Sequence, residues 1–180
     1  MRANTRSGVA VAAGVALGLS AHWLRKAAVQ GASAATGAWD TALAAEHATA
    51  LRVFDLIERT DTQQSAQRKV LLASLKYAIA RHAFQEENVI YTMMRDHGLT
   101  EAADHLNHDH GYVKQYFFDL GEMPADSPEW LPKVQEFRTM IVEHMREEED
   151  ELFPRLRGSL SEAQNRHVTV AMHREGVKLA

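Results

Sequence analysis

The sequence predicts an all-α protein built around an up-down-up-down four-helix bundle, with an apolar Ala/Gly-rich helix before it and a short helix after it. Only 4 of the 180 residues are proline, which suits long helices. Apolar residues recur three, four and seven positions apart in four successive segments, which is the spacing of one helix face. No segment shows the sustained two-residue alternation that is typical of a strand.

Residues 1–38 differ from the rest and are predicted to be an anchor or signal-like segment followed by a linker. Residues 8–24 form an apolar run close to the roughly 20 residues that span a bilayer. Arg25 and Lys26 follow it, whereas a secretory signal normally carries no positive charge before its cleavage site, here Ala32-Ser33-Ala34. The sequence therefore favours a membrane anchor over a cleaved signal, with a soluble Ala-rich helix as the third interpretation. A membrane-anchored or periplasmic location is expected over a plain cytoplasmic one.

The bundle is predicted over residues 39–157, and a C-terminal helical tail over residues 158–180. Gly98 stands where a helix C-terminus favours a left-handed residue, and Thr100 can cap the next helix. Ser127-Pro128 is a helix-start signature, and Ser161 can cap the last helix. These signals place helices at about 40–58, 66–97, 100–121, 127–153 and 162–176.

Composition excludes several classes of function. A net charge of −4 and a pI near 6.2 argue against a nucleic-acid partner, which requires neutralisation of phosphates. The absence of cysteine excludes disulfides, zinc–thiolate sites and thiol nucleophiles. No phosphate-binding loop, dinucleotide fingerprint or nucleophile motif occurs. The chain does contain 10 histidines, and histidine is the commonest metal ligand.

Histidine interrupts the apolar stripe of each predicted bundle helix, and in two of them a glutamate follows one turn later. A buried carboxylate without partners costs several kcal/mol, so two of them in a core require a compensating cation. The expected inward stripes are Leu43, His47, Ala50, Phe54 and Ile57; Leu72, Leu75, Ile79, His82, Glu86, Val89 and Met93; Leu106, His110, Val113, Phe117 and Leu120; and Val134, Phe137, Ile141, His144, Glu148 and Leu152.

The spacing of these residues shows a duplicated helical hairpin. His47 and His82 are 35 residues apart, His110 and His144 are 34 apart, and a glutamate follows each second histidine by four. The offset between the halves is 63 residues for the first histidine and 62 for the second histidine and the glutamate. Two such hairpins packed face to face would bring four imidazoles and two carboxylates together between the helices. Such mixed ligands suit iron, manganese or zinc.

Other polar residues near these positions are expected to play no part. Glu147, Glu149 and Asp150 are interpreted as a solvated face, whereas Glu151, seven residues after His144, should face inward as a reserve carboxylate. His105 and His108 point away from the His110 face and are expected at the surface. The tyrosines are expected to pack, although one near the metals could hydrogen-bond a ligand. A ferritin-like site is excluded because no Glu-x-x-His tetrapeptide occurs.

Several segments resemble the HHE cation-binding domain of the hemerythrin family, over about Trp39 to Leu156. They are Ala45-Glu46-His47, His82-Ala-Phe-Gln-Glu86-Glu87 with Val89-Ile90-Tyr91, Asp109-His110, and His144-Met-Arg-Glu147-Glu148-Glu149 with Leu152-Phe153-Pro154. The resemblance implies a hemerythrin-like bundle with a non-haem pair of iron ions, iron being expected over manganese or zinc. The implied metal ligands are His47, His82, Glu86, His110, His144 and Glu148, with both glutamates bridging the ions.

One departure from the family concerns oxygen carriage. Oxygen-carrying hemerythrins have two histidines four apart on the third helix, whereas Leu106 and Lys114 flank His110 here. The remaining pattern is closer to the bacterial iron–sulfur-cluster repair branch and to unassigned bacterial HHE proteins. That repair branch usually has an extra amino-terminal domain with a cysteine, and this chain contains no cysteine.

Three functions remain open at this stage. The first is a di-iron module that binds or reacts with oxygen, nitric oxide or peroxide in sensing, scavenging or iron handling. The second is an enzyme or iron donor that protects or repairs iron centres under oxidative or nitrosative stress. The third is a structural bundle without metal. The sequence favours the first, because the duplicated ligand set identifies a site but no reductant or substrate.

Overall fold

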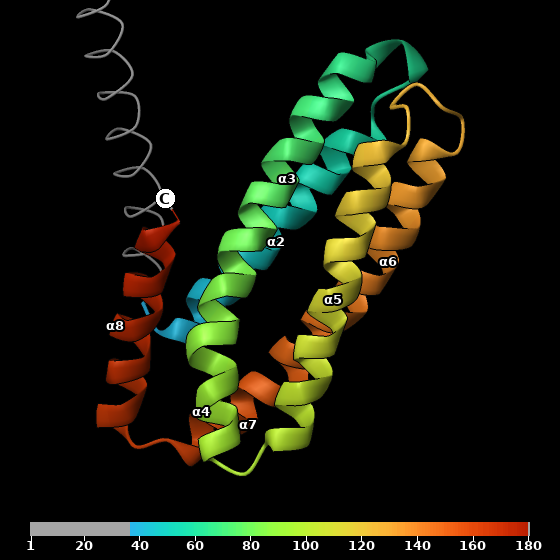
Figure 1. The fold of residues 1–180 in the computed structure, drawn as a ribbon. Helices are drawn as coiled ribbons and strands as arrows, with labels where there is room; N and C mark the ends of the chain where they lie inside the picture. Colours follow the sequence, from blue (N-terminus) through green and yellow to red (C-terminus); the bar gives the residue numbers. More distant parts are fainter. Residues whose placement is uncertain (1–36, 180) are drawn as a thin grey trace, which may run out of the picture.

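The computed structural model describes residues 37–179, and this part of the chain is helical, with no strand (Figure 1). Consecutive long helices run in opposite directions, which confirms the predicted up-down-up-down bundle (Figure 1). The apolar run 8–24 lies outside the described residues. Within residues 37–179, no helix has both the length and the apolar character needed to cross a bilayer.

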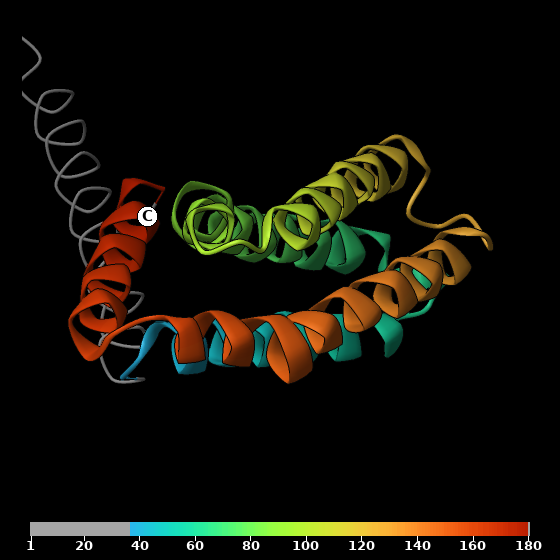
Figure 2. The same ribbon diagram turned by 90° about the horizontal axis from the view of Figure 1, so that it is seen from below.

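The bundle has two layers, with α3, α4 and α5 in one and α2, α6 and α7 in the other (Figure 2). The last helix, α8, packs beside α2 and α3 at one end (Figures 1 and 2). The elements are α2 (Trp39–Glu58), η1 (Thr62–Gln64), α3 (Ser65–Gln85), η2 (Glu86–Ile90), α4 (Tyr91–Asp96), α5 (Thr100–Glu122), α6 (Trp130–Glu147), η3 (Glu148–Leu152), α7 (Phe153–Ser159) and α8 (Glu162–Lys178).

Most of the helix boundaries follow the sequence signals. Gly98 has a φ of 80°, the left-handed conformation expected after α4, and Ser161 caps α8 in a capping box with Gln164. Two predicted starts are displaced. Thr100 is the first residue of α5 and its side chain makes no cap, while Ser127 begins a turn so that α6 starts at Trp130.

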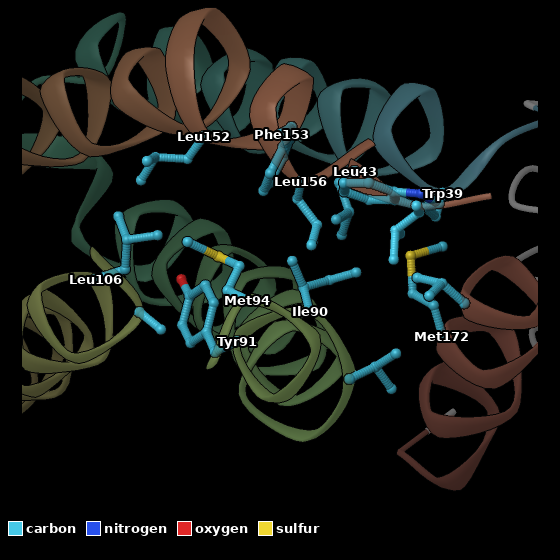
Figure 3. Close-up of a cluster of buried hydrophobic side chains, with 14 of the residues drawn as sticks. Trp39, Leu43, Ile90, Tyr91, Met94, Leu106, Leu152, Phe153, Leu156 and Met172 are labelled. Atoms are coloured by element: carbon cyan, nitrogen blue, oxygen red, sulfur yellow. The ribbon is translucent and has the colours of Figure 1, made fainter. Parts of the chain in front are cut away.

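Two apolar clusters fill the bundle, one on each side of the predicted histidine and glutamate positions. The first cluster, which includes Leu106, Leu152 and Phe153, lies where the two layers meet α8 (Figure 3). The second includes Phe54, Phe137 and Trp130 and fills the opposite end. Along each of the four long helical segments, the predicted ligand positions fall between residues of the two clusters. The polar site is therefore enclosed by apolar packing above and below.

Both glutamates of the predicted site begin a π-helical turn. The Tyr91 N–H donates to the Glu86 carbonyl and the Phe153 N–H to the Glu148 carbonyl, five residues earlier in each case. A π-turn inserts about one residue into the helix and rotates everything after it. This explains why Glu151, predicted to face inward, is exposed.

The same rotation changes the end of the second predicted stripe. Met93 is only half-buried, whereas Ile90, Tyr91 and Met94 are fully buried in the first apolar cluster. The π-turn at Glu86 therefore carries Tyr91, which the α-helical period leaves out of the inward stripe, toward the middle of the bundle.

Candidate metal centre

The six predicted ligand positions come together in the middle of the bundle, one or two from each long helical segment. Every one of these side chains is buried, with between 0% and 7% of its surface exposed. They form two overlapping groups of candidate ligand atoms, with Glu86 in both. One consists of His47, His82, Glu86 and Glu148, and the other of Glu86, His110 and His144.

Each histidine pair comes from one hairpin. The Nε2 atoms of His47 and His82 are 2.8 Å apart, and the ring centroids are 4.4 Å apart. The rings of His110 and His144 have centroids 5.0 Å apart. All four Nε2 atoms face the carboxylates between the pairs, so each hairpin presents two nitrogen donors to the centre of the bundle.

Each glutamate lies between the two pairs and approaches one histidine from each. Glu86 Oε1 is 3.0 Å from His82 Nε2, and its Oε2 is 3.6 Å from His110 Nε2. Glu148 Oε2 is 3.4 Å from His47 Nε2, and its Oε1 is 3.5 Å from His144 Nε2. Both carboxylates could therefore reach ions held by either pair.

Two of these oxygens indicate that a cation fits here. Glu86 Oε1 and Glu148 Oε2 are fully buried and accept no hydrogen bond, although each lies close to one imidazole Nε2, at 3.0 and 3.4 Å. A buried carboxylate oxygen without a partner is strongly unfavourable, and a cation between the histidine pairs would satisfy both oxygens. The donor set of imidazole and carboxylate is the mixture that divalent transition metals accept.

The electrostatics of the cluster support the same conclusion. Burial opposes the charged form of Glu148, but His47 and the charge of His144 outweigh it and lower the pKa of Glu148 to about 2. Burial also opposes charge on His82, yet Glu86 and Glu46 raise the pKa of His82 well above its usual value. The carboxylates therefore draw positive charge into the site, which protons supply when no ion does.

The outward nitrogen of every histidine faces a further acidic residue. These contacts fix the imidazole rings with Nε2 directed at the centre, as carboxylate partners of metal-binding histidines do. The Nδ1 distances are 2.7 Å from His47 to Glu149, 3.2 Å from His82 to Glu46, 3.0 Å from His110 to Glu87 and 3.4 Å from His144 to Asp109.

These outer acids were missed or misassigned from sequence. Glu149 was expected on a solvated face and is indeed exposed, but its Oε1 also contacts His47 of the other hairpin, which was missed. The pattern repeats in both halves, because an acid precedes each first histidine and another follows each glutamate ligand. Glu46 and Asp109 support the second histidine of their own hairpin, while Glu87 and Glu149 support the first histidine of the opposite one. This repeated spacing was the available signal.

Tyr91 is a further site residue: the sequence predicts that the tyrosines pack and allows that one near the metals could hydrogen-bond a ligand, without indicating which. Its side chain is fully buried, and its hydroxyl donates to Glu148 Oε1 at 2.8 Å. The Tyr91 hydroxyl oxygen also lies 3.2 Å from His110 Nε2 and 3.5 Å from Glu86 Oε2. Burial, together with the charges of Glu86 and Glu148, raises the pKa of Tyr91 well above its usual value, so the hydroxyl stays a donor.

The positions that flank His110 by one turn offer no additional ligand. Leu106 is fully buried in the first apolar cluster, and Lys114 is exposed with its ammonium 3.3 Å from Glu87. His105 and His108 are exposed, which confirms their predicted surface position. His105 instead lies 3.4 Å from Glu147 at the surface.

A small cavity adjoins the histidines on the side of the second apolar cluster. Its volume is about 350 Å³ including its mouth, and its walls include Ala50, Val113, Ile141 and Met145 beside the four histidines. The free interior is about 20 Å³, enough for roughly one water-sized molecule. Only a very small ligand could therefore occupy it without rearrangement.

Comparison with known proteins agrees with this geometry. Residues 40–156 match the hemerythrin HHE cation-binding domain. An uncharacterized hemerythrin-like protein of Schizosaccharomyces pombe is 28% identical over 101 residues, which cover 54% of this chain and 50% of that protein. The chain thus spans about half the length of this relative, and the search of solved structures gives no match. The chain belongs to the hemerythrin HHE cation-binding domain family.

Proposed function

We propose that this chain holds two non-haem iron ions and binds or reacts with oxygen, nitric oxide or peroxide, in sensing, scavenging or iron handling. His47 and His82 would hold one ion, His110 and His144 the other, and Glu86 and Glu148 would bridge them. The observation that carries the proposal is the pair of buried carboxylates, each with an unpartnered oxygen, between two histidine pairs.

Iron is favoured by the kind of donor present. Four imidazoles and two carboxylates provide nitrogen and oxygen ligands, without the thiolates that Cu(I) prefers. A pair of iron ions supplies open coordination positions and electrons for a small ligand. Six protein ligands are too few to saturate two such ions, so positions remain for that ligand.

The surrounding residues control what reaches the centre. The outer acids hold the imidazole rings in place, so that the ligand atoms need little reorganisation when an ion binds. The apolar walls of the cavity limit water, and its small interior selects for molecules of two or three atoms. Tyr91 lies beside both carboxylates and can hold a hydrogen bond to a small ligand or to the bridging carboxylates.

The symmetry of the ligand set favours reaction over reversible oxygen carriage. A carrier leaves one iron open while three histidines saturate the other, and here Leu106 and Lys114 stand where a further histidine would be needed. Two equivalent two-histidine positions leave both ions accessible. We therefore expect the reduced protein to oxidise quickly in air instead of releasing oxygen.

Metal analysis and stopped-flow spectroscopy test this proposal together. Protein expressed with sufficient iron should contain close to two irons per chain, and the reduced protein should lose its ferrous state within the mixing experiment with oxygen, peroxide or nitric oxide. Tyr91→Phe, which keeps all six ligands, should retain the iron but change the reaction rate. Protein without metal would refute the proposal, and a long-lived oxygenated form that releases oxygen intact would refute the non-carrier part. Multiple turnovers with a supplied reductant would favour an enzyme over a binding module.

A further inference from the structure

An apolar groove runs along the α3–α5 face of the bundle. It consists of two adjoining hollows with free volumes of about 340 and 370 Å³, both lined by Lys76 and Phe117. The first hollow extends toward the candidate metal centre and the second toward the loop before α6. Each hollow has more apolar than polar surface.

The groove is open because small residues stand where larger ones would close it. Ala73, Ala80 and Ala83 line it from α3, and Gly121 lines it from α5. None of these side chains is long enough to reach the facing helix. The hollow is therefore a consequence of the sequence of these two helices.

The duplicated hairpins provide an internal comparison, because the α2–α6 face is equivalent to the α3–α5 face. There, Arg138 closes the face through ion pairs with Asp55 and Glu58. Lys76 stands at the position equivalent to Arg138, 62 residues earlier. At the positions equivalent to the two acids, 63 residues later, are Phe118 and Gly121.

Of the three lysines that line the groove, Lys114 is paired with Glu87 at the end near His110, and the other two have no acidic partner among the described residues. Lys69 and Lys76 are exposed and make no ion pair among residues 37–179. The surface beside them is apolar, from Leu72 to Ile79 and Phe117, and the end of the first hollow near His110 carries the acid Glu87, which disfavours an anionic head there. Unpaired ammonium groups beside an apolar floor match a ligand with an anionic head and a hydrocarbon chain.

The groove also leads to the centre. Ile79, Ala83, His110 and Val113 line both the first hollow and the small cavity beside the histidines. From Lys69 to Ala83 the groove follows 14 residues of α3, which at 1.5 Å per residue is about 21 Å. An extended hydrocarbon chain can therefore lie along it with one end near His110.

We propose that the α3–α5 groove binds a fatty acid, with its carboxylate at Lys69 and Lys76 and its chain directed over Phe117 and Ile79 toward His110. Binding itself depends only on the groove. A further consequence rests on the proposed metal centre: the groove selects fatty-acid hydroperoxides among the peroxides that the centre receives. The chain and the carboxylate would supply recognition that the small cavity alone cannot.

Calorimetric titration of the metal-free and iron-loaded full-length protein with dodecanoate, below its micelle concentration, tests binding. One molecule should bind per chain in both forms, and dodecyltrimethylammonium, with the same chain length and a cationic head, should bind at least tenfold more weakly. Lys76→Gln should weaken dodecanoate binding about threefold, and Lys69→Gln with Lys76→Gln about tenfold. Lys178→Gln, at an exposed lysine of α8 outside both hollows, is the control and should change nothing.

Filling the groove provides the second variant. Ala80 is exposed, so Ala80→Leu adds bulk to the groove without disturbing the core, and it should reduce binding about tenfold or more. Ser74→Leu adds a leucine to an exposed position of α3 outside both hollows and should have no effect. Absence of binding to both protein forms, or equal binding of the two amphiphiles, would overturn the proposal. Conversion of a dimer into a monomer by Ala80→Leu would also overturn it, because the face would then be an interface between copies.

The direction of the chain is tested by NMR. In iron-loaded protein the terminal methyl signal of bound dodecanoate should broaden, while the methylene next to the carboxylate should broaden less. The reverse order would overturn the proposed orientation. If the protein contains no iron and dodecanoate binds without any broadening, the proposed metal centre is contradicted and the groove inference stands. The failure of one proposal can therefore be distinguished from the failure of the other.

Discussion

The two hairpins that form the centre, α2–α3 and α5–α6, provide the same ligands in different surroundings. In the first hairpin, Arg81 and Gln85 donate to Glu46, which supports His82. In the second, Asp109 supports His144, but Glu143 and Glu147 occupy the positions equivalent to Arg81 and Gln85. The second hairpin thus replaces two donors with two acids.

Helix α8 increases this difference, because it packs against α2, α3 and η2 beside the first hairpin. Gln85 is 1% exposed, and a Cβ atom on Gly176 of α8 would lie 3.0 Å from its side-chain amide. The support of His82 is therefore enclosed and closely packed. Asp109 is 21% exposed and has the solvent-exposed His105 as its other neighbour.

The comparison shows which features the shared site constrains. The six candidate ligands keep their register because both halves face the same space, whereas the outer positions contact different neighbours and have diverged. Two ions bound here would have equal numbers of histidine ligands and unequal surroundings. At His82 the outer acid Glu46 is enclosed and paired with Arg81, while at His144 the outer acid Asp109 is partly exposed and has no Arg or Lys partner in the part of the chain that the structure describes.

The largest loss of metal and of stability is expected from single variants that remove a histidine ligand, one variant for each hairpin. His82→Ala and His144→Ala should each reduce the iron content from close to two ions per chain to one or fewer. Because an ion at 1,000 times its Kd contributes about 4 kcal/mol, the Tm should fall by roughly 10 °C. Metal analysis and calorimetry measure both quantities, and unchanged iron in either variant would contradict the ligand assignment.

The two variants should also differ from each other. His82→Ala removes the imidazole partner of Glu46, which keeps Arg81 and Gln85, and leaves a gap in an enclosed position that water cannot readily fill, so its loss of stability should be the greater. His144→Ala leaves Asp109, which water can reach. Equal losses of Tm would indicate that the enclosure by α8 has no energetic consequence.

A smaller loss of metal affinity is expected from removing an outer acid, and it should differ between the two hairpins. Glu46→Ala should weaken the binding of one ion by about 10-fold to 100-fold, as removal of a supporting carboxylate typically does. Asp109→Ala should weaken binding by about 10-fold or less, because solvent can replace a side chain that is partly exposed. Competition with a chelator gives both affinities. A larger effect from Asp109→Ala would show that the support of His144, and not that of His82, matters more for holding the ions.

Much of this site could be predicted from the sequence, because a duplicated register is a long-range signal. The spacing of His47, His82, His110 and His144, with a glutamate four residues after each second histidine, placed all six residues together. Local chemistry also predicted the left-handed Gly98 and the Ser161 cap, both confirmed. These features depend on helical periodicity and on single residues, which the sequence displays directly.

The parts that could not be predicted depend on departures from the α-helical period or on contacts between hairpins. The π-turn at Glu86 moves Tyr91 inward, and the π-turn at Glu148 moves Glu151 outward. Neither turn could be predicted, because no residue type is specific to a π-turn. Glu149 looked like one of a run of surface acids, because its partner His47 lies on the opposite hairpin. Packing of the two hairpins decides such contacts.

The pH dependence of stability should distinguish protons from metal as the cations of the centre. Because the pKa of His82 is raised, protonation of His82 stabilises the metal-free protein fully at any pH below 6.5, the usual pKa of histidine. This contribution is lost as the pH rises through the pKa that His82 has in the folded protein. The lowered pKa of Glu148 contributes stability above 4.5, which is lost as pH falls toward about 2. The metal-free protein should therefore be most stable between about pH 4.5 and 6.5.

Metal-loaded protein should behave differently above this range, because ions bind the deprotonated ligands. The difference in Tm between loaded and metal-free protein should widen by several degrees from about pH 5.5 to about pH 8. Thermal unfolding with and without a chelator measures it. A difference that is constant with pH would show that protons and metal do not compete for the same histidines.

The smallest effect is expected from the surface histidines of the second hairpin. His105 is 55% exposed, with its Nε2 3.8 Å from Asp109 and 3.4 Å from Glu147, and His108 packs its ring against Tyr112. His105→Ala removes a weak neighbour of Asp109 and leaves the Asp109 contact with His144 in place, so metal affinity should change by about twofold or less. His108→Ala should leave it unchanged. Because α5 directs His110 inward, release of an ion by His105→Ala would mean that this helix is rotated and that His105 holds the ion in place of His110.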